Sequence, residues 1–216
     1  MTTRREDDPR PALVSASARF YERGWMAGTA GNLSARASEE SLWITPSGRP
    51  KGDLAVEDLI RVGRSGQLAE GETRRPSAET ALHTSVYYLF PSARFCYHVH
   101  TIEANLVTRL TTADSVPLPP LEMLKGFGIL EENPRVEIPI FPNHREVARI
   151  AADVRGRFEH MSSRIPAFLI RDHGMTFWAS DPVEAMNHAE LLDYILRYLI
   201  AAHAAGLPVA SWGQPG

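Results

Sequence analysis

Two histidines separated by a single residue lie in the stretch RFCYHVHTIEAN, where His98 and His100 close a run of apolar and aromatic residues. Side chains alternate along a strand, so a strand over residues 95–100 puts Cys96, His98 and His100 on one face. The other face is apolar and aromatic and is expected to pack on the core, which turns the histidine face towards a cleft or an interface. Two neighbouring imidazoles suit one metal ion, although two histidines also occur on a strand without any metal.

A catalytic zinc ion usually has three protein ligands and one position open to water or substrate. His173 is the best third candidate, because in IRDHGMTFWA an apolar strand gives way to a glycine turn that exposes the imidazole. A histidine before glycine is also a common turn residue. Three neutral imidazoles favour Zn²⁺, and we expect one ion per subunit. The remaining histidines lie on predicted helices or at their ends, where a structural role is expected: His83, His144, His160, His188 and His203.

Three short segments share a chemistry suited to phosphate. GTAGNLS, TPSGRPKG and RPSAET all carry hydroxyl side chains and the first two carry glycines, TPSGRPKG adds the cationic residues Arg49 and Lys51, and the third segment begins a predicted helix. Glycine lets backbone N–H groups approach a ligand closely, and a helix N-terminus attracts negative charge. Each segment alone is typical of an ordinary turn. All three precede the histidine strand, which makes a phosphate-binding site a reasonable hypothesis.

Two carboxylates have alternative interpretations. Glu79 falls in the first turn of the predicted second helix, where the helix dipole already favours a negative charge. Glu122, in PPLEMLKGFG, lies on irregular backbone near a helix start, either as a surface residue or as a general acid–base beside the metal. The second role requires burial that raises its pKa towards the working pH.

Composition limits the class of protein. The chain has 216 residues, a formal net charge of −3, 44% hydrophobic and 23% charged residues, and one cysteine. These values are typical of one globular domain, without the basic excess of a nucleic-acid surface. There is no apolar run of the roughly 18 to 20 residues that a membrane span needs. A single cysteine favours a reducing compartment. Because MTTRREDDPRP is charged and lacks the apolar segment of a signal peptide, we expect a cytoplasmic protein. We expect a disordered leader at 1–10 and one domain at 11–216.

Helices and strands alternate along the chain. Capping residues, glycine stops and periodicity predict helices from Pro11 to Gly24, over 77–90, over 143–161 and from Asp181 to Gly206. Strands are predicted at 41–45 and 95–100, and on both sides of the turn at Asp172 and His173. This pattern predicts an α/β sandwich and leaves the strand order open.

GTAGNLS, ITPSG, RPSAET, HVH and HG, in this order over nearly the whole chain, resemble the class II aldolase and adducin family. The resemblance implies a three-layer α/β/α sandwich around a mostly antiparallel sheet. It also implies a homotetramer with active sites at subunit boundaries. It assigns Zn²⁺ to His98, His100 and His173, and substrate phosphate to Gly31, Asn32, Ser47, Gly48 and Ser77. Fuculose-phosphate aldolases usually carry a second serine where this chain has Ala78.

Within the family, PLEMLKGF, IPIFPN and HGMTFWA are most similar to the members that dehydrate methylthioribulose 1-phosphate in methionine salvage. In those members the glutamate matching Glu122 is the acid–base group, here expected to take the C3 proton and then protonate the departing C4 hydroxyl. Glu79 is expected to bind substrate. Because fuculose-phosphate aldolases rely on the glutamate matching Glu79, a sugar-phosphate aldolase or epimerase remains the alternative. An adducin-like module without catalysis is disfavoured, since all three candidate ligands are present.

Overall fold

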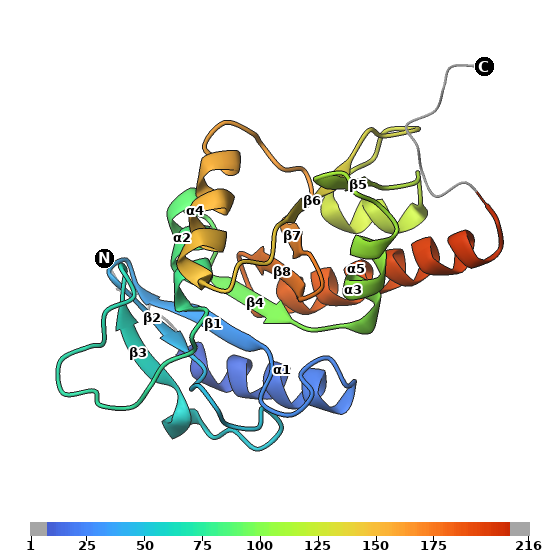
Figure 1. Ribbon diagram of the computed structural model, residues 1–216. Helices are drawn as coiled ribbons and strands as arrows, with labels where there is room; N and C mark the ends of the chain where they lie inside the picture. Colours follow the sequence, from blue (N-terminus) through green and yellow to red (C-terminus); the bar gives the residue numbers. More distant parts are fainter. Residues whose placement is uncertain (1–7, 208–216) are drawn as a thin grey trace.

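The computed structural model describes residues 8–207 (Figure 1), so most of the expected leader lies outside the described residues. Its helices are α1 (Arg10–Glu22), α2 (Thr80–Leu89), α3 (Ile102–Arg109), α4 (Val147–Phe158) and α5 (Pro182–Ala204), with short 3₁₀ helices η1 (Val56–Asp58) and η2 (Glu122–Phe127). Its strands are β1 (Asn32–Ser38), β2 (Ser41–Ile44), β3 (Ile60–Gly63), β4 (Phe95–Val99), β5 (Ser115–Pro117), β6 (Glu137–Phe141), β7 (Ala167–Ile170) and β8 (Gly174–Ala179). Over these residues, none of the helices has the length and apolarity needed to cross a bilayer.

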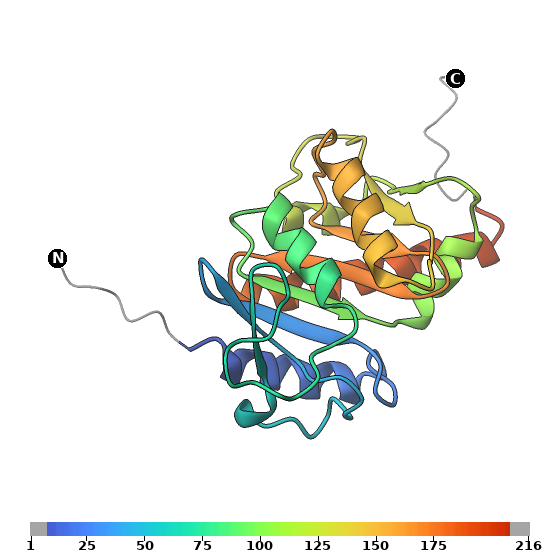
Figure 2. The ribbon, with the colours of Figure 1, turned by 60° about the vertical axis from the view of Figure 1, so that its left-hand side comes forward.

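The eight strands form one sheet in the order β3-β2-β1-β4-β8-β7-β6-β5. Neighbouring strands are antiparallel except β6 and β7, which run parallel. Helices α1, α3 and α5 cover one face, while α2 and α4 pack side by side on the other (Figures 1 and 2). The fold is therefore the expected three-layer α/β/α sandwich with a mostly antiparallel sheet.

Strand β4 separates two hydrophobic cores. Tyr97 points to the α1 and α5 side, where its ring lies edge-on to Phe20 and Phe177 at centroid distances of 5.7 and 5.8 Å. Cys96 points to the opposite side and packs in the core beneath α2 and α4. The alternation along β4 is thus as predicted. The expectation that the histidine face looks outward is wrong, because a helical layer covers it and both Cys96 and His98 are fully buried.

The ends of the helices follow their capping residues to different degrees. Helix α5 is as predicted: the Asp181 side chain accepts hydrogen bonds from two backbone N–H groups of the first turn, each at 2.9 Å. Helix α4 begins at Val147, four residues after the start of the helix predicted over 143–161, because Glu146 adopts an extended conformation. Helix α2 begins at Thr80 rather than Ser77. Strands β1, β3, β5 and β6 and helix α3 are not predicted from the sequence.

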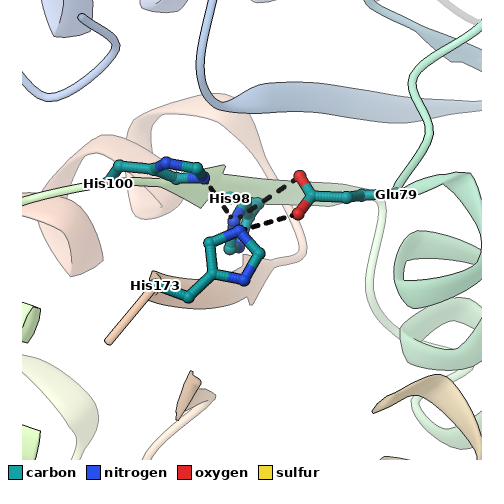
Figure 3. A group of neighbouring side chains, drawn as sticks. All are labelled: Glu79, His98, His100 and His173. Atoms are coloured by element: carbon teal, nitrogen blue, oxygen red, sulfur yellow. Dashed lines mark hydrogen bonds and ion pairs between the residues drawn. The ribbon is translucent and has the colours of Figure 1, made fainter. Parts of the chain in front are cut away.

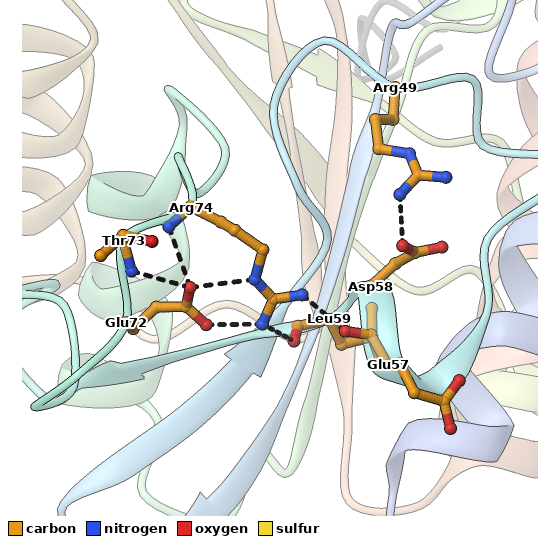
Figure 4. Close-up of polar contacts among 7 residues, drawn as sticks. All are labelled: Arg49, Glu57, Asp58, Leu59, Glu72, Thr73 and Arg74. Atoms are coloured by element: carbon orange, nitrogen blue, oxygen red, sulfur yellow. Dashed lines mark hydrogen bonds and ion pairs between the residues drawn. The ribbon is translucent and has the colours of Figure 1, made fainter.

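Two ion pairs secure the long connections around β3 (Figure 4). Arg74 donates to the Glu72 carboxylate and to the backbone carbonyl of Leu59, 3.2 Å away, which fastens the loop that leads to α2. The bond from Arg74 lowers the pKa of Glu72 to about 2, so this carboxylate is ionised at neutral pH. Arg49 pairs with Asp58 of η1 and fastens the turn after β2. Both loops carry predicted ligand-binding residues.

Candidate metal centre

Three histidines and one glutamate from distant parts of the chain converge at the carboxyl end of the central strand β4 (Figure 3). His98 is the penultimate residue of β4 and His100 follows the strand. His173 lies in the turn between β7 and β8, and Glu79 is the N-cap residue of α2. The four potential ligand atoms lie within 4.8 Å of one another. His98 Nε2 is 2.9 Å from His100 Nε2, and His173 Nε2 is 2.9 Å from Glu79 Oε1. The structure therefore brings together the three histidines that the sequence singled out.

The antiparallel pairing of β4 with β8 puts the histidines in place. His98 lies opposite Thr176 in this ladder, and its Nδ1 atom is 2.8 Å from the Thr176 hydroxyl. With Nδ1 hydrogen-bonded, Nε2 of His98 is free to bind an ion, as is usual for metal-binding histidines. Gly174 begins β8 directly after His173. A Cβ at Gly174 would lie 3.1 Å from the His100 ring, so the absence of a side chain there lets these two histidines meet.

The protonation states suit a cation. Burial lowers the pKa of His98 well below its usual value and that of His100 to about 4, so both imidazoles are neutral near pH 7. Burial alone would raise the pKa of Glu79, but its contacts with His98, His173 and Asn32 hold that pKa well below the ordinary range. The site thus offers imidazole lone pairs and one carboxylate charge, a donor set suited to Zn²⁺. In a tetrahedral complex with bonds of about 2 Å, ligand atoms are separated by roughly 3.3 Å, which is compatible with this cluster.

The GTAGNLS segment packs directly against the histidine–glutamate cluster. Asn32 lies opposite His98 in the β1–β4 ladder, and its side-chain amide donates to Glu79. Gly31 precedes it with a φ of +74°, and a Cβ there would lie 3.0 Å from the His98 carbonyl oxygen. Both the conformation and the close approach therefore require glycine at this position.

The other two predicted phosphate segments are joined to each other. The Ser47 N–H donates to the Arg75 carbonyl at 3.0 Å, and residues 46 and 76 form an isolated β-bridge. Gly48 is exposed beside Ser47, in a left-handed turn with a φ of +71°. The Ser77 hydroxyl is largely buried and accepts a hydrogen bond from the backbone N–H of Glu79 at 3.2 Å. Ser77 therefore lies two residues before Glu79, a member of the cluster, and is hydrogen-bonded to its backbone.

Lys51 connects the first two segments. Its side chain is only 1% exposed, and its ammonium donates to the backbone carbonyls of Thr29 at 2.9 Å and Arg49 at 2.7 Å. Burial lowers the pKa of Lys51, while the negative charge of Glu79 acts in the opposite direction. A buried ammonium thus holds the two glycine loops together near the cluster.

Glu122 is the predicted site residue that lies apart from the cluster. It begins η2, its side chain is 77% exposed, and it forms an ion pair with Lys125 at 2.7 Å. Helix η2 lies on the α5 side of the sheet, since its Phe127 ring packs on His188 of α5 with a centroid distance of 5.1 Å. The burial on which the sequence-based argument for Glu122 depended is not found within a single chain.

Two polar partners of the site have no functional role predicted from the sequence. Thr176 orients His98, and His83 hydrogen-bonds the Asn32 side chain from within α2. His83 was expected to be structural, and it is fully buried with both ring nitrogens hydrogen-bonded. Its spacing of four residues after Glu79 was the available signal, because this spacing puts both on one helix face. Thr176 had no such signal without the strand pairing.

The sandwich and the histidine–glutamate cluster define an α/β/α protein with a candidate metal centre at the end of its sheet. The chain belongs to the class II aldolase and adducin family: the model of the Class II Aldolase and Adducin N-terminal domain matches residues 11–200. A methylthioribulose-1-phosphate dehydratase from Microcystis aeruginosa is 50% identical over 198 residues, 91% of this chain and 97% of that protein. The dehydratase of the same name from Leptospira biflexa is 37% identical over 87% of this chain and 94% of that protein. Among solved structures, L-fuculose-1-phosphate aldolase from Thermus thermophilus superposes with a TM-score of 0.69 at 25% identity, covering 90% of this chain and 94% of that one.

Proposed function

We propose that this chain is a hydro-lyase that dehydrates 5-methylthioribulose 1-phosphate to 2,3-diketo-5-methylthiopentyl 1-phosphate, a step of methionine salvage. The observation that carries the proposal is the convergence of His98, His100 and His173 with Glu79 at one point. The substrate assignment is supported by relatives that bear the dehydratase name and align with nearly the whole chain.

We propose Zn²⁺ as the ion, held by the three imidazoles, with Glu79 as a fourth ligand in the absence of substrate. A divalent ion bound there supplies Lewis acidity to the oxygens around the reacting carbons. Thr176 keeps His98 in the orientation that presents Nε2. The Asn32 amide donates to Glu79 and adds to the contacts with His98 and His173 that hold the pKa of Glu79 low.

We propose that Gly31, Asn32, Ser47, Gly48 and Ser77 bind the substrate phosphate. Support comes from the contacts that gather these loops beside the cluster: the Ser47 bond to Arg75 and the Lys51 bonds to the two loop carbonyls. A phosphate fixed there holds the carbon chain in one orientation relative to the acid–base group. Such orientation effects lower activation barriers by several kcal/mol.

We propose Glu122 as the acid–base group, taking the C3 proton and returning it to the departing C4 hydroxyl, so that one water leaves. Glu122 is exposed and lies on the α5 side of the sheet, outside the histidine–glutamate cluster of its own chain. We therefore propose a homotetramer in which Glu122 of the partner subunit completes each site. We also propose a cytoplasmic location, with which the one cysteine of the chain, the free and buried Cys96, is consistent.

The test is product identification. The purified, zinc-loaded protein is incubated with 5-methylthioribulose 1-phosphate and, separately, with fuculose 1-phosphate, and the products are identified by mass spectrometry. Loss of one water from the first substrate is expected. If the carbon chain of either substrate is instead cleaved into two smaller products, the protein is a sugar-phosphate aldolase. The position of Glu79 in the cluster makes this the alternative function.

A further inference from the structure

A row of polar side chains crosses the buried interface between α2 and β1. Helix α2 and its cap contribute Glu79, His83 and Tyr87, which are four residues apart and share one helix face. Strand β1 contributes Asn32 and Ser34, two residues apart on one face of the sheet. We call these five residues the polar ladder. Buried polar groups are costly unless they are hydrogen-bonded, so a ladder of this length calls for an explanation.

Hydrogen bonds link the polar ladder from end to end. The Tyr87 hydroxyl is 2.9 Å from the Ser34 hydroxyl, which is 2.6 Å from His83 Nδ1. His83 Nε2 contacts the side-chain oxygen of Asn32, and the Asn32 amide nitrogen contacts Glu79. The polar ladder therefore leads from the protein interior to the histidine–glutamate cluster.

The directions of these bonds follow from the charge on Glu79. A carboxylate only accepts hydrogen bonds, so Asn32 must turn its NH₂ group towards Glu79 and its oxygen towards His83. His83 must then carry its proton on Nε2, which leaves Nδ1 as an acceptor. The Ser34 hydroxyl donates to Nδ1 at 2.6 Å in preference to the more distant Cys96 carbonyl at 3.4 Å. Because burial lowers the pKa of His83 to about 4, the ring is neutral and has one donor and one acceptor.

We propose that His83 is a positioning residue that fixes the Asn32 amide and thereby holds Glu79 in place beside the three histidines. The two ring nitrogens of His83 hydrogen-bond Ser34 and Asn32, so its hydrogen-bonded link to Glu79 runs through Asn32. Without the Nε2–H donor, the Asn32 amide is free to turn its oxygen towards Glu79, where two acceptors repel each other. The inference rests on the proposed function only in taking the cluster as the reaction site.

The test measures metal binding and needs no substrate. His83→Leu removes both hydrogen bonds, whereas His83→Gln keeps an N–H donor near the position of Nε2. We expect His83→Leu to weaken Co²⁺ binding about tenfold, the low end of the range for residues that hydrogen-bond a metal ligand. Competition with a chelator gives the affinity, and the visible absorption of bound Co²⁺ reports the ligand geometry. His83→Gln is expected to recover affinity and spectrum to within about threefold of the parent protein.

His188→Gln is the control, since it also removes a buried histidine, whose Nδ1 atom contacts the Trp178 carbonyl at 2.9 Å from α5, on the face of the sheet opposite α2. It should leave Co²⁺ affinity unchanged. A folded His83→Leu protein with the parent affinity and spectrum would overturn the proposal, and so would equal weakening in His83→Leu and His83→Gln. These outcomes do not depend on whether the protein dehydrates methylthioribulose phosphate.

A second measurement uses the unaltered protein and needs no variant. Nitrogen-15 NMR of histidine-labelled protein distinguishes the two neutral imidazole forms, and His83 is expected to carry its proton on Nε2. Finding the proton on Nδ1 would mean that Asn32 presents its NH₂ group to His83 and not to Glu79, which contradicts the proposal.

Discussion

Gly174 and Val99 lie so close across the β4–β8 ladder that a Cβ on Gly174 would stand 2.3 Å from the Val99 carbonyl oxygen. Real Cβ atoms do not approach a carbonyl this closely, and the obstacle is backbone rather than a flexible side chain. The close approach also sets the distance between His173, one residue before Gly174, and His100, one residue after Val99. Metal-site geometry therefore depends on a residue that offers no ligand atom.

Gly174→Ala is expected to reduce metal affinity while the protein still folds. The added methyl group has to push β8 away from β4, at a cost of about 1–3 kcal/mol in the free energy of unfolding. The shift separates His173 from His100. Metal content after dialysis and urea unfolding measure the two effects. Gly156→Ala is the control, because Gly156 lies within α4 with open space around its Cβ position, and a modest stabilisation of about 0.5–1 kcal/mol is expected there. Parent-like metal content in Gly174→Ala would contradict the prediction.

His98→Ala is expected to lose both bound metal and activity. Loss of a direct ligand should weaken metal binding by more than about 100-fold, beyond the range for outer partners. Metal analysis and turnover of 5-methylthioribulose 1-phosphate check this result. In the unaltered protein, zinc at about 100 times its Kd should add about 2.7 kcal/mol to the free energy of unfolding, which a chelator removes. His144→Ala is the control, since His144 contacts Asp153 outside the cluster. Full activity without bound metal would remove the Lewis-acid premise.

The sequence was most informative where structure is determined locally. Asp181 followed by Pro182 predicts the start of α5, and the alternation around His98 predicts the two faces of β4. The alternation of elements predicted an α/β sandwich, and the family resemblance then supplied its three layers and mostly antiparallel sheet and supported the choice of the three histidines. Short motifs carry this information because capping and alternation involve neighbouring residues only.

The features that escaped prediction depend on distant contacts. Strand β1 begins at Asn32 within a glycine-rich stretch typical of a loop, and its pairing with β4 makes it a strand. Glu79 was predicted to lie in the first turn of its helix. In the structure α2 begins at Thr80, so Glu79 is the N-cap residue, and its side chain contacts His173. Thr176 becomes a partner of His98 only through the register between β4 and β8. Periodicity contains no information about such pairings.

Glu122→Gln is expected to retain metal and lose dehydration. The amide cannot exchange a proton with C3 or the C4 hydroxyl, so kcat should fall about 10²- to 10⁴-fold. Zinc content and circular dichroism should match those of the parent protein, because the Glu122 side chain is exposed and its ion pair is with Lys125, itself an exposed residue. Glu132→Gln, a nearby exposed carboxylate that lines the same surface hollow, is the control and should turn over normally. Normal turnover by Glu122→Gln would assign the acid–base role to a different group.

Mixing two inactive variants tests whether a site is shared between subunits. Subunits carrying His98→Ala lack a proposed metal ligand, and subunits carrying Glu122→Gln lack the proposed acid–base group. After co-refolding in equal amounts, about a quarter of sites at a subunit boundary should combine both intact residues, with activity to match. Sites contained within one subunit would recover no activity. Chromatography with light scattering on the unmixed protein gives the oligomeric state independently.

Lys51→Met is expected to raise the KM for the phosphorylated substrate more than it lowers kcat. Removing the ammonium leaves the Thr29 and Arg49 carbonyls without their donor, and losing a hydrogen bond to a charged group costs about 1.5–3 kcal/mol in the free energy of unfolding. The two glycine loops can then separate, so phosphate is held less firmly while the histidines remain in place. Steady-state kinetics, zinc content and inhibition by inorganic phosphate distinguish these effects. Arg64→Met, which removes an exposed cation, should change none of them. An equal loss of zinc and of kcat in Lys51→Met would mean that the ammonium supports the metal centre rather than the phosphate loops.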